Sequence, residues 1–472
     1  MESSCMKKIV LATAIMLAFA MSFAQGYRIT VELPDAAGRE LLLAHYYGTQ
    51  ILVTDTIRPD SRGKGEFRGD SLLPQGLYKI FLDNDNHFDF LLSTDQQFKI
   101  SGKNFSNKEV QFSGATETEE FADYVGFLSG QQQKRREIEA KWENASAEEK
   151  EIYQNEINRL TEELHAYWKS KAGQYPGTWL ASFLMANYVP EPDEKKLPEH
   201  IRNNDSLLLR YKFEFQQQHF FDFFDITDER FLTTPLLKPK LETYFTKVLY
   251  QMYDSVKTGV LGLIEKSRPS PPMFRYITSY FLNESINSKL MGMDALFVDI
   301  AKKYYLSGEA FWVDSTTIAK IRENVIFAEH NLIGMEAPEL LLEGLDGEQY
   351  FSLHQIDAKV TLVLIYEPGC SHCNEFVPSL YENVYKPYSG KGLEVYAIYS
   401  MDNKKEWEDF IGKYGLYNWI NVWDEYHVSA FKIMYDARET PRIYVLDENK
   451  KIIAKKLAVE QVKRVVEIEL GI

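Results

Sequence analysis

The sequence predicts a multidomain protein with an N-terminal antiparallel β-sandwich or barrel, a central all-α domain and a C-terminal α/β domain. Short segments in which every second residue is apolar fill residues 25–114, and this period is typical of half-buried strands. The apolar period becomes helical over residues 115–333. Strand and helix patterns then alternate over residues 334–472, which is typical of an α/β domain. A length of 472 residues is enough for two or three such domains.

Residues 1–24 have the features of a secretory signal peptide. Two lysines precede an apolar stretch, residues 9–23, and Ala24 ends a small-residue pattern at which cleavage is expected. The stretch is short for a membrane-spanning helix, so an uncleaved signal that anchors the protein is the alternative. Cys5 lies before the apolar stretch and would be removed with the signal.

The pattern of residues 25–114 indicates a sheet with one buried and one solvated face. Ile29, Val31 and Leu33 alternate with polar residues, as in a strand at the surface of a β domain. Further strands are expected at residues 41–47, 51–57, 66–68, 77–82, 88–92, 98–101 and 110–113. Glycine and proline at residues 63–65 and 74–76 indicate turns between them.

Residues 115–333 have apolar residues at helical spacing and no clear internal repeat. Ser146 and Glu149 form the pattern of a capping box at the start of one helix. Further helices are expected at residues 179–188, 205–221, 240–263, 272–292, 295–305 and 315–330. An aromatic cluster is interpreted as core, because helical domains bury such residues, and a partner-binding groove is the alternative. It comprises Tyr211, Phe213, Phe215, Phe220, Phe221, Phe223 and Phe224.

The C-terminal part contains an apolar, β-branched stretch at residues 360–366. Such a stretch is typical of a strand that is buried on both faces of a sheet. Glu367, Pro368 and Gly369 end the strand, and a helical pattern begins at Cys370. The remaining expected elements are a hairpin at 345–347, strands at 393–399, 442–446 and 451–456, helices at 370–385, 404–414 and 459–470, and a less regular stretch before residue 441.

Cys370 and Cys373 are three residues apart at the start of this helix, so both sulfurs lie on one helix face. The unpaired amide groups and the positive end of the helix dipole stabilise a thiolate at Cys370. A thiolate is a nucleophile and a good leaving group, and a second thiol can resolve the mixed disulfide. After signal cleavage these are the only two cysteines. A zinc site is disfavoured because zinc requires four ligands.

This stretch resembles the active site of the thioredoxin superfamily. A strand, a C-x-x-C motif at a helix start and Pro378, five residues after Cys373, are its first mark. Thr440 and Pro441, which precede the apolar residues 443–446, are similar to the cis-proline loop of this family. The resemblance implies a thioredoxin fold and a cis bond before Pro441, beside the two sulfurs. It also implies that the backbone of Thr440 pairs with a substrate segment.

The resemblance extends more weakly to the rest of the chain. Residues 334–338 and the hairpin after them are similar to the secreted TlpA/ResA-like branch. Residues 25–114 and 115–333 resemble a β domain and a helical region, both of unknown function, that precede thioredoxin-like domains in secreted proteins of Gram-negative bacteria. The implied location is the periplasm.

Three positions depart from the family pattern, and they concern the handling of protons. Leu364 stands where thioredoxins bury an acid, and Phe376 stands where the TlpA/ResA-like branch often has a glutamate. Gly369 replaces the usual tryptophan. The residues that could take over, or tune the thiolate, are His372, Glu375 and Glu367. His372 would stabilise the thiolate by a hydrogen bond or a positive charge, and a solvent-facing role is the alternative.

The leading hypothesis is a periplasmic thiol–disulfide oxidoreductase with Cys370 as nucleophile, Cys373 as resolving thiol and Pro441 in the substrate loop. Its substrates would be protein disulfides or thiols, and its electrons would come from a membrane donor, with no cofactor. The direction of exchange stays open. The alternative is a secreted binding or scaffold protein with a redox-idle thioredoxin-like domain. A net charge of −16 argues against nucleic acid and against an anionic membrane surface as partner.

Overall fold

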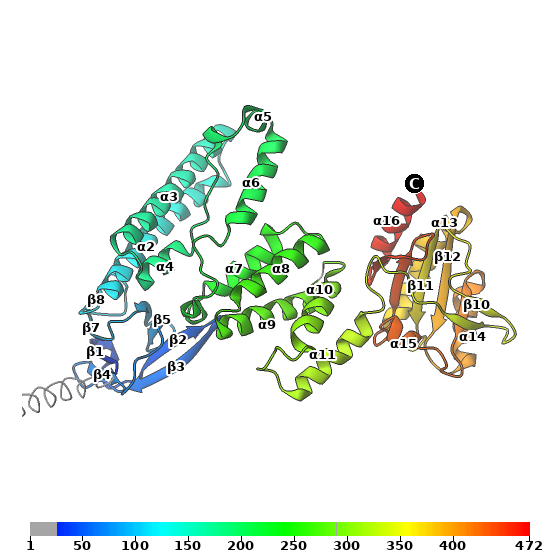
Figure 1. Cartoon of the computed structure of the whole chain (residues 1–472), viewed down its shortest axis with the longest axis horizontal. Helices are drawn as coiled ribbons and strands as arrows, with labels where there is room; N and C mark the ends of the chain where they lie inside the picture. Colours follow the sequence, from blue (N-terminus) through cyan, green and yellow to red (C-terminus); the bar gives the residue numbers. More distant parts are fainter. Residues whose placement is uncertain (1–25, 289) are drawn as a thin grey trace, which may run out of the picture. The chain divides into compact units, whose positions relative to one another are not determined.

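A computed structural model describes residues 26–288 and 290–472 of the protein (Figure 1). The expected signal peptide, with Cys5, lies outside these residues. The chain forms two compact units: unit 1 comprises residues up to 251 and 266–273, and unit 2 comprises residues 252–265 and 274–472. Within the part of the chain that the structure describes, no helix is both long and apolar enough to cross a membrane.

Unit 1 begins with the predicted β domain, which consists of two four-stranded sheets around one core. The core side chains come from both sheets and include the fully buried Ile29, Phe67 and Phe90. One pair, β1 with β7, is parallel, and the other pairs are antiparallel. The strand order in the first sheet is β4 (Lys64–Arg68), β1 (Arg28–Glu32), β7 (Gln97–Gly102) and β8 (Val110–Ser113). The strand order in the second sheet is β3 (Gln50–Ile57), β2 (Leu41–Tyr47), β5 (Gly76–Phe81) and β6 (His87–Leu92).

The rest of unit 1 is helical, as predicted. Its helices are α2 (Thr116–Trp142), α3 (Ala147–Gln174), α4 (Trp179–Met185), α5 (Glu199–Arg202), α6 (Asp205–His219) and α7 (Leu237–Thr243). The capping box is confirmed: Ser146 accepts from the backbone of Glu149, whose carboxylate accepts from the backbone of Ser146. The aromatic cluster was predicted to be core, but only Phe220 and Phe224 are buried, and Phe223 is exposed.

The single helix predicted over residues 240–263 is wrong. Helix α7 continues into a π-helical turn, Tyr244–Val248, and the chain is extended at Leu249 before α8 (Tyr253–Ser267) begins. The side-chain amide of Gln251 donates to the carbonyl groups of Phe245 and Leu249 at 3.0 and 2.8 Å. This side chain therefore satisfies carbonyl groups that a helix end leaves without an intrahelical partner.

Unit 2 combines helices with the α/β domain. Its helices before the sheet are most of α8 and α9 (Pro271–Asn287), then α10 (Met293–Ile300), a π-helical turn (Ala301–Tyr305) and α11 (Ser315–Ala328). Lys455, at the end of the last strand, bonds Asp294 in α10 and Asn331 after α11. The last two helices are therefore fixed to the α/β domain by polar contacts of a buried lysine.

The C-terminal sheet has seven strands in the order β10-β9-β13-β12-β11-β14-β15. Strands β11, β12 and β13 are parallel, and β14 and β15 are antiparallel to their neighbours. The strands are β9 (Leu341–Gly344), β10 (Tyr350–Ser352), β11 (Val360–Tyr366), β12 (Leu393–Tyr399), β13 (Ile420–Trp423), β14 (Arg442–Leu446) and β15 (Ile452–Lys455). Strand β13 and the short helix α15 (Phe431–Met434) lie in the stretch that was expected to be less regular.

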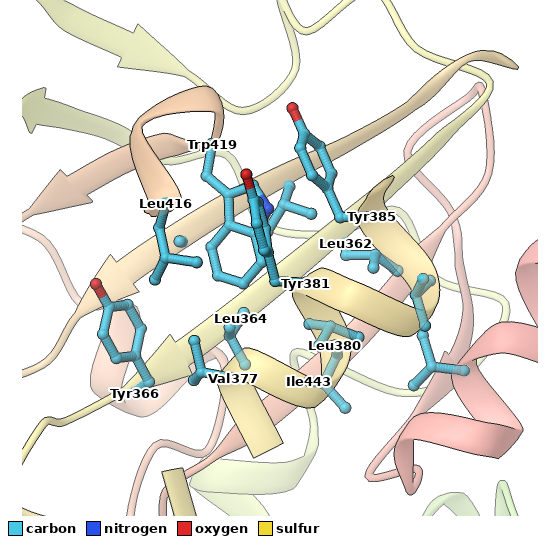
Figure 2. Packing of buried hydrophobic residues seen from close by; sticks show 14 of the residues in the cluster. Leu362, Leu364, Tyr366, Val377, Leu380, Tyr381, Tyr385, Leu416, Trp419 and Ile443 are labelled. Atoms are coloured by element: carbon cyan, nitrogen blue, oxygen red, sulfur yellow. The ribbon is translucent and has the colours of Figure 1, made fainter. Parts of the chain in front are cut away.

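Strand β11 lies at the centre of this domain and is buried along its whole length. Leu362, Leu364 and Tyr366 point into one core, which also contains Val377 of α12 (Ser371–Leu380), as Figure 2 shows. The intervening residues of the strand belong to a second core on the other face. Helices α14 (Lys404–Tyr414) and α16 (Val459–Leu470) contribute to the first core. Packed side chains on both faces hold β11 fixed, so its carboxyl end is a rigid base for the residues that follow.

Candidate functional site

Cys370 occupies the position that the sequence predicted, directly before helix α12. It is the N-cap residue of that helix, with an extended backbone, and its own N–H donates to the carbonyl of Glu367 at 3.3 Å. Its side chain is partly exposed, whereas Cys373, one helical turn further on, is fully buried. Both sulfurs are present as free thiols. Only Cys370 is therefore open to attack a disulfide of another molecule.

The two thiols differ in acidity. Burial would raise the pKa of Cys370, but hydrogen bonds that involve Cys373, the Thr440 side chain and the His372 backbone lower that pKa below its ordinary value. Burial raises the pKa of Cys373 to about 12. Because the thiolate is the reactive form, Cys370 is the more nucleophilic of the two at neutral pH.

The loop before strand β14 lies beside the reactive sulfur. The Thr440–Pro441 peptide bond is cis, as the family resemblance implied. The thiol of Cys370 donates to the backbone carbonyl of Thr440 at 3.3 Å. The hydroxyl of Thr440 donates to the carboxylate of Glu367 at 2.8 Å. The structure thus brings the two cysteines, Cys370 and Cys373, next to Thr440 and Pro441. Cys370 and Thr440 are 70 residues apart in the chain.

Asn374 holds the active-site turn, and sequence reasoning missed it. Its side-chain amide donates to the carbonyl groups of Pro368 and Cys370 at 2.6 and 3.0 Å. The hydroxyl of Tyr414 in α14 donates to the amide oxygen of Asn374 at 3.2 Å. Asn374 therefore satisfies two carbonyl groups of the turn that carries Cys370. An asparagine directly after C-x-x-C, in the first turn of a helix, is the signal that could have indicated this role.

A polar pocket of about 490 Å³ opens beside the site. Its lining contains both acidic and basic side chains, and three of the charged residues, Lys432, Arg438 and Glu439, were not anticipated from the sequence. The lining residues are Glu367, His372, Ser400, Met401, Lys432, Ala437, Arg438, Glu439 and Thr440. Ser400 and Met401 follow strand β12, and the carboxyl ends of parallel strands are where α/β proteins bind ligands.

The tuning candidates occupy different surroundings. His372 is exposed on the pocket, and a hydrogen bond from its backbone contributes to lowering the pKa of Cys370. Glu375 is exposed on α12 and makes no hydrogen bond or ion pair with residues 26–288 or 290–472. Leu364 is fully buried in the core, so no acid occupies that position. Within the same described ranges, no three His, Cys, Asp or Glu side chains are grouped as metal ligands would be.

The central sheet, the C-x-x-C motif at the start of α12 and the cis-proline loop together define a thioredoxin-like domain. Residues 332–468 match the Redoxin family, and this domain of the chain belongs to it. The match covers the whole α/β domain apart from its last residues. No curated protein matches the chain.

Solved structures resemble parts of the chain. A domain of a possible thiol-disulfide isomerase from Cytophaga hutchinsonii is 35% identical and covers 30% of this chain and 95% of its own, with a TM-score of 0.28. The thioredoxin domain of a thiol-disulfide oxidoreductase from Bacteroides vulgatus is 27% identical and covers 29% and 97%, with a TM-score of 0.27. A thioredoxin-like protein from Bacteroides caccae is 19% identical and covers 60% and 98%, with a TM-score of 0.46.

Proposed function

We propose that the protein is a periplasmic thiol–disulfide oxidoreductase that exchanges its Cys370–Cys373 pair with cysteines of other proteins. The observation that carries this proposal is the asymmetry of the two thiols. Cys370 is partly exposed and its pKa is lowered, whereas Cys373 is fully buried and its pKa is raised. Such a pair separates the roles of attack and resolution.

In the reducing direction, the Cys370 thiolate attacks one sulfur of a substrate disulfide and releases the other sulfur as a thiolate. A mixed disulfide between Cys370 and the substrate results. Cys373 then loses its proton and attacks the sulfur of Cys370, which releases the second substrate thiolate and leaves a Cys370–Cys373 disulfide. One dithiol is oxidised and one disulfide is reduced, and the two released sulfurs take up protons.

The loop at Thr440 and Pro441 is suited to hold the substrate chain. In the free protein the Thr440 carbonyl accepts the proton of Cys370 at 3.3 Å. That carbonyl becomes free to accept a substrate N–H when Cys370 ionises, and a substrate segment then pairs with it as an added strand. The substrates are therefore polypeptides with a disulfide or an oxidised cysteine in an extended segment.

Each cycle leaves the pair oxidised, so a second dithiol must reduce it again. We infer a membrane-bound electron donor, because the leader sequence directs the chain out of the cytoplasm, away from soluble reductants. The chain carries no other cysteine after the signal sequence, so it has no internal dithiol that could reduce the pair.

The test is reduction of insulin by the purified chain without residues 1–24, in the presence of dithiothreitol. The wild-type chain accelerates this reaction, and Cys370→Ser abolishes the acceleration. Cys373→Ser keeps the attacking thiol, so in the absence of dithiothreitol it attacks a disulfide-linked peptide, releases one peptide thiol and accumulates the mixed disulfide with the other, detectable by mass spectrometry. Equal rates for the wild type and Cys370→Ser would instead favour a binding or scaffold protein with a redox-idle domain.

A further inference from the structure

Two groups in the active site, the carboxylate of Glu367 and the thiolate of Cys370, compete for the proton of one hydroxyl. The hydroxyl of Thr440 donates to the carboxylate of Glu367 at 2.8 Å. A hydrogen bond from the same side chain to the sulfur of Cys370 or Cys373 lowers the pKa of that thiol, and the backbone carbonyl of Thr440 lies 3.3 Å from the Cys370 sulfur. A hydroxyl has a single proton, so it cannot donate to the carboxylate and to a thiolate at the same time.

We propose that Glu367 is a positioning residue that withholds the Thr440 hydroxyl from the Cys370 thiolate and so makes the pair a better electron donor. This inference rests on the proposed function and adds the direction of exchange to it. Glu367 does not touch the substrate sulfur in this account. It acts through Thr440, which it holds with a charge-assisted hydrogen bond.

The physical reason is competition between two anions. A hydrogen bond to a charged acceptor is about twice as strong as one to a neutral acceptor. While Cys370 is a thiol, it donates to the Thr440 carbonyl, and the hydroxyl is given to Glu367. When Cys370 ionises, the hydroxyl must leave the carboxylate before it can stabilise the thiolate. A less stable thiolate means a less stable reduced form, and hence a lower reduction potential.

Other charged groups line the same pocket as Glu367. His372, Lys432 and Arg438 are basic, and Glu439 is acidic. Arg438 is already paired with Asp436 at 2.7 Å. Tyr399 of β12 also faces Glu367, whose charge contributes to raising the pKa of that tyrosine. None of these groups receives the Thr440 proton, so substitution at Glu367 and Thr440 isolates the competition.

The experiment measures thiolate ultraviolet absorbance against pH, and the equilibrium with glutathione, on the full chain without residues 1–24. The variants are Glu367→Gln, Thr440→Val and the double variant. In Glu367→Gln the neutral amide oxygen loses the competition, so the Cys370 pKa falls by about one unit. The glutathione equilibrium shifts up to tenfold towards the dithiol, which corresponds to a rise of about 30 mV in potential. In the Thr440→Val background, the same substitution at Glu367 has a clearly smaller effect.

Glu375→Gln is the matched control. It removes the same charge from the exposed face of α12, without a bond to Thr440, and leaves the pKa of Cys370 unchanged. The inference is overturned if Glu367→Gln behaves like Glu375→Gln. It is also overturned if the effect of Glu367→Gln is the same with and without the Thr440 hydroxyl, because charge alone would then explain it. A wild-type chain that shows no exchange with glutathione or insulin refutes the proposed function instead, and the pKa measurement still tests Glu367 and Thr440.

Discussion

The ammonium group of Lys455, in the last strand of the sheet, donates to the backbone carbonyl of Asn331 at 2.6 Å. It also bonds the side-chain oxygen of Asn331 at 2.9 Å and the carboxylate of Asp294. Lys455 is buried, and burial lowers its pKa even though Asp294 opposes that change. The thioredoxin-like domain and the helices before it are therefore joined through a buried cation whose hydrogen-bond and ion-pair partners lie on the helical side.

The first prediction concerns this buried pair. Asp294→Asn leaves the cation of Lys455 buried without a counter-charge, and we expect a loss of about 3–5 kcal/mol in the stability of unit 2. Lys455→Met removes the charge and keeps an apolar stem, so it should cost far less, and it should rescue Asp294→Asn in the double variant. Hydrogen exchange of the amides in β15 measures the effect. Equal losses for both single variants, with no rescue, would contradict it.

The second prediction concerns selective alkylation. The pKa of Cys370 is lowered and that of Cys373 is raised to about 12. At neutral pH, iodoacetamide should therefore modify Cys370 and spare Cys373, since only the thiolate reacts. The rate should rise as the pH increases through the pKa of Cys370 and level off below the ordinary thiol value. Peptide mapping by mass spectrometry identifies the modified cysteine, and modification of Cys373 in the folded wild type would reverse the assigned roles.

The third prediction separates the backbone of His372 from its imidazole. His372→Ala keeps the backbone N–H that helps to lower the pKa of Cys370, and the exposed imidazole is screened by solvent. We expect this variant to raise the pKa of Cys370 by less than about half a unit. His372→Pro removes the N–H as well, at a helix position that tolerates proline, and should raise that pKa more. An equal rise in both variants would show that the imidazole is the main stabilising group.

The fourth prediction concerns Asn374. Asn374→Asp cannot donate to the carbonyl groups of Pro368 and Cys370, and it places a negative charge against them. Each lost hydrogen bond costs about 0.5–1.5 kcal/mol, so we expect faster hydrogen exchange in residues 367–373 and slower insulin reduction. Tyr414→Phe is the control, because it removes only the bond to the amide oxygen of Asn374. An unchanged turnover in Asn374→Asp would show that the turn does not need this side chain.

The sequence was a good guide wherever a local pattern decides the structure. Strands β11, β12 and β14 and helices α14 and α16 have the bounds that their apolar periods predicted. Strand β13 was missed, because its residues are paired by neighbours that are distant in the chain rather than by a pattern of their own. The predicted helix over residues 240–263 failed because Gln251 supplies hydrogen bonds that let the chain turn. The local spacing of apolar residues does not indicate where such a turn interrupts a helix.

By itself, the sequence determined the order of the three structural parts, the central strand and the two cysteines at the start of a helix. These follow from periodicity and from spacing, which act over a few residues. Only the tertiary structure decided which carboxylate lies next to the site. Of Glu367 and Glu375, the first is bonded to Thr440 and the second faces solvent. The reason is that the cis-proline loop returns to the helix from 70 residues away, and contacts of that range depend on how the sheet is assembled.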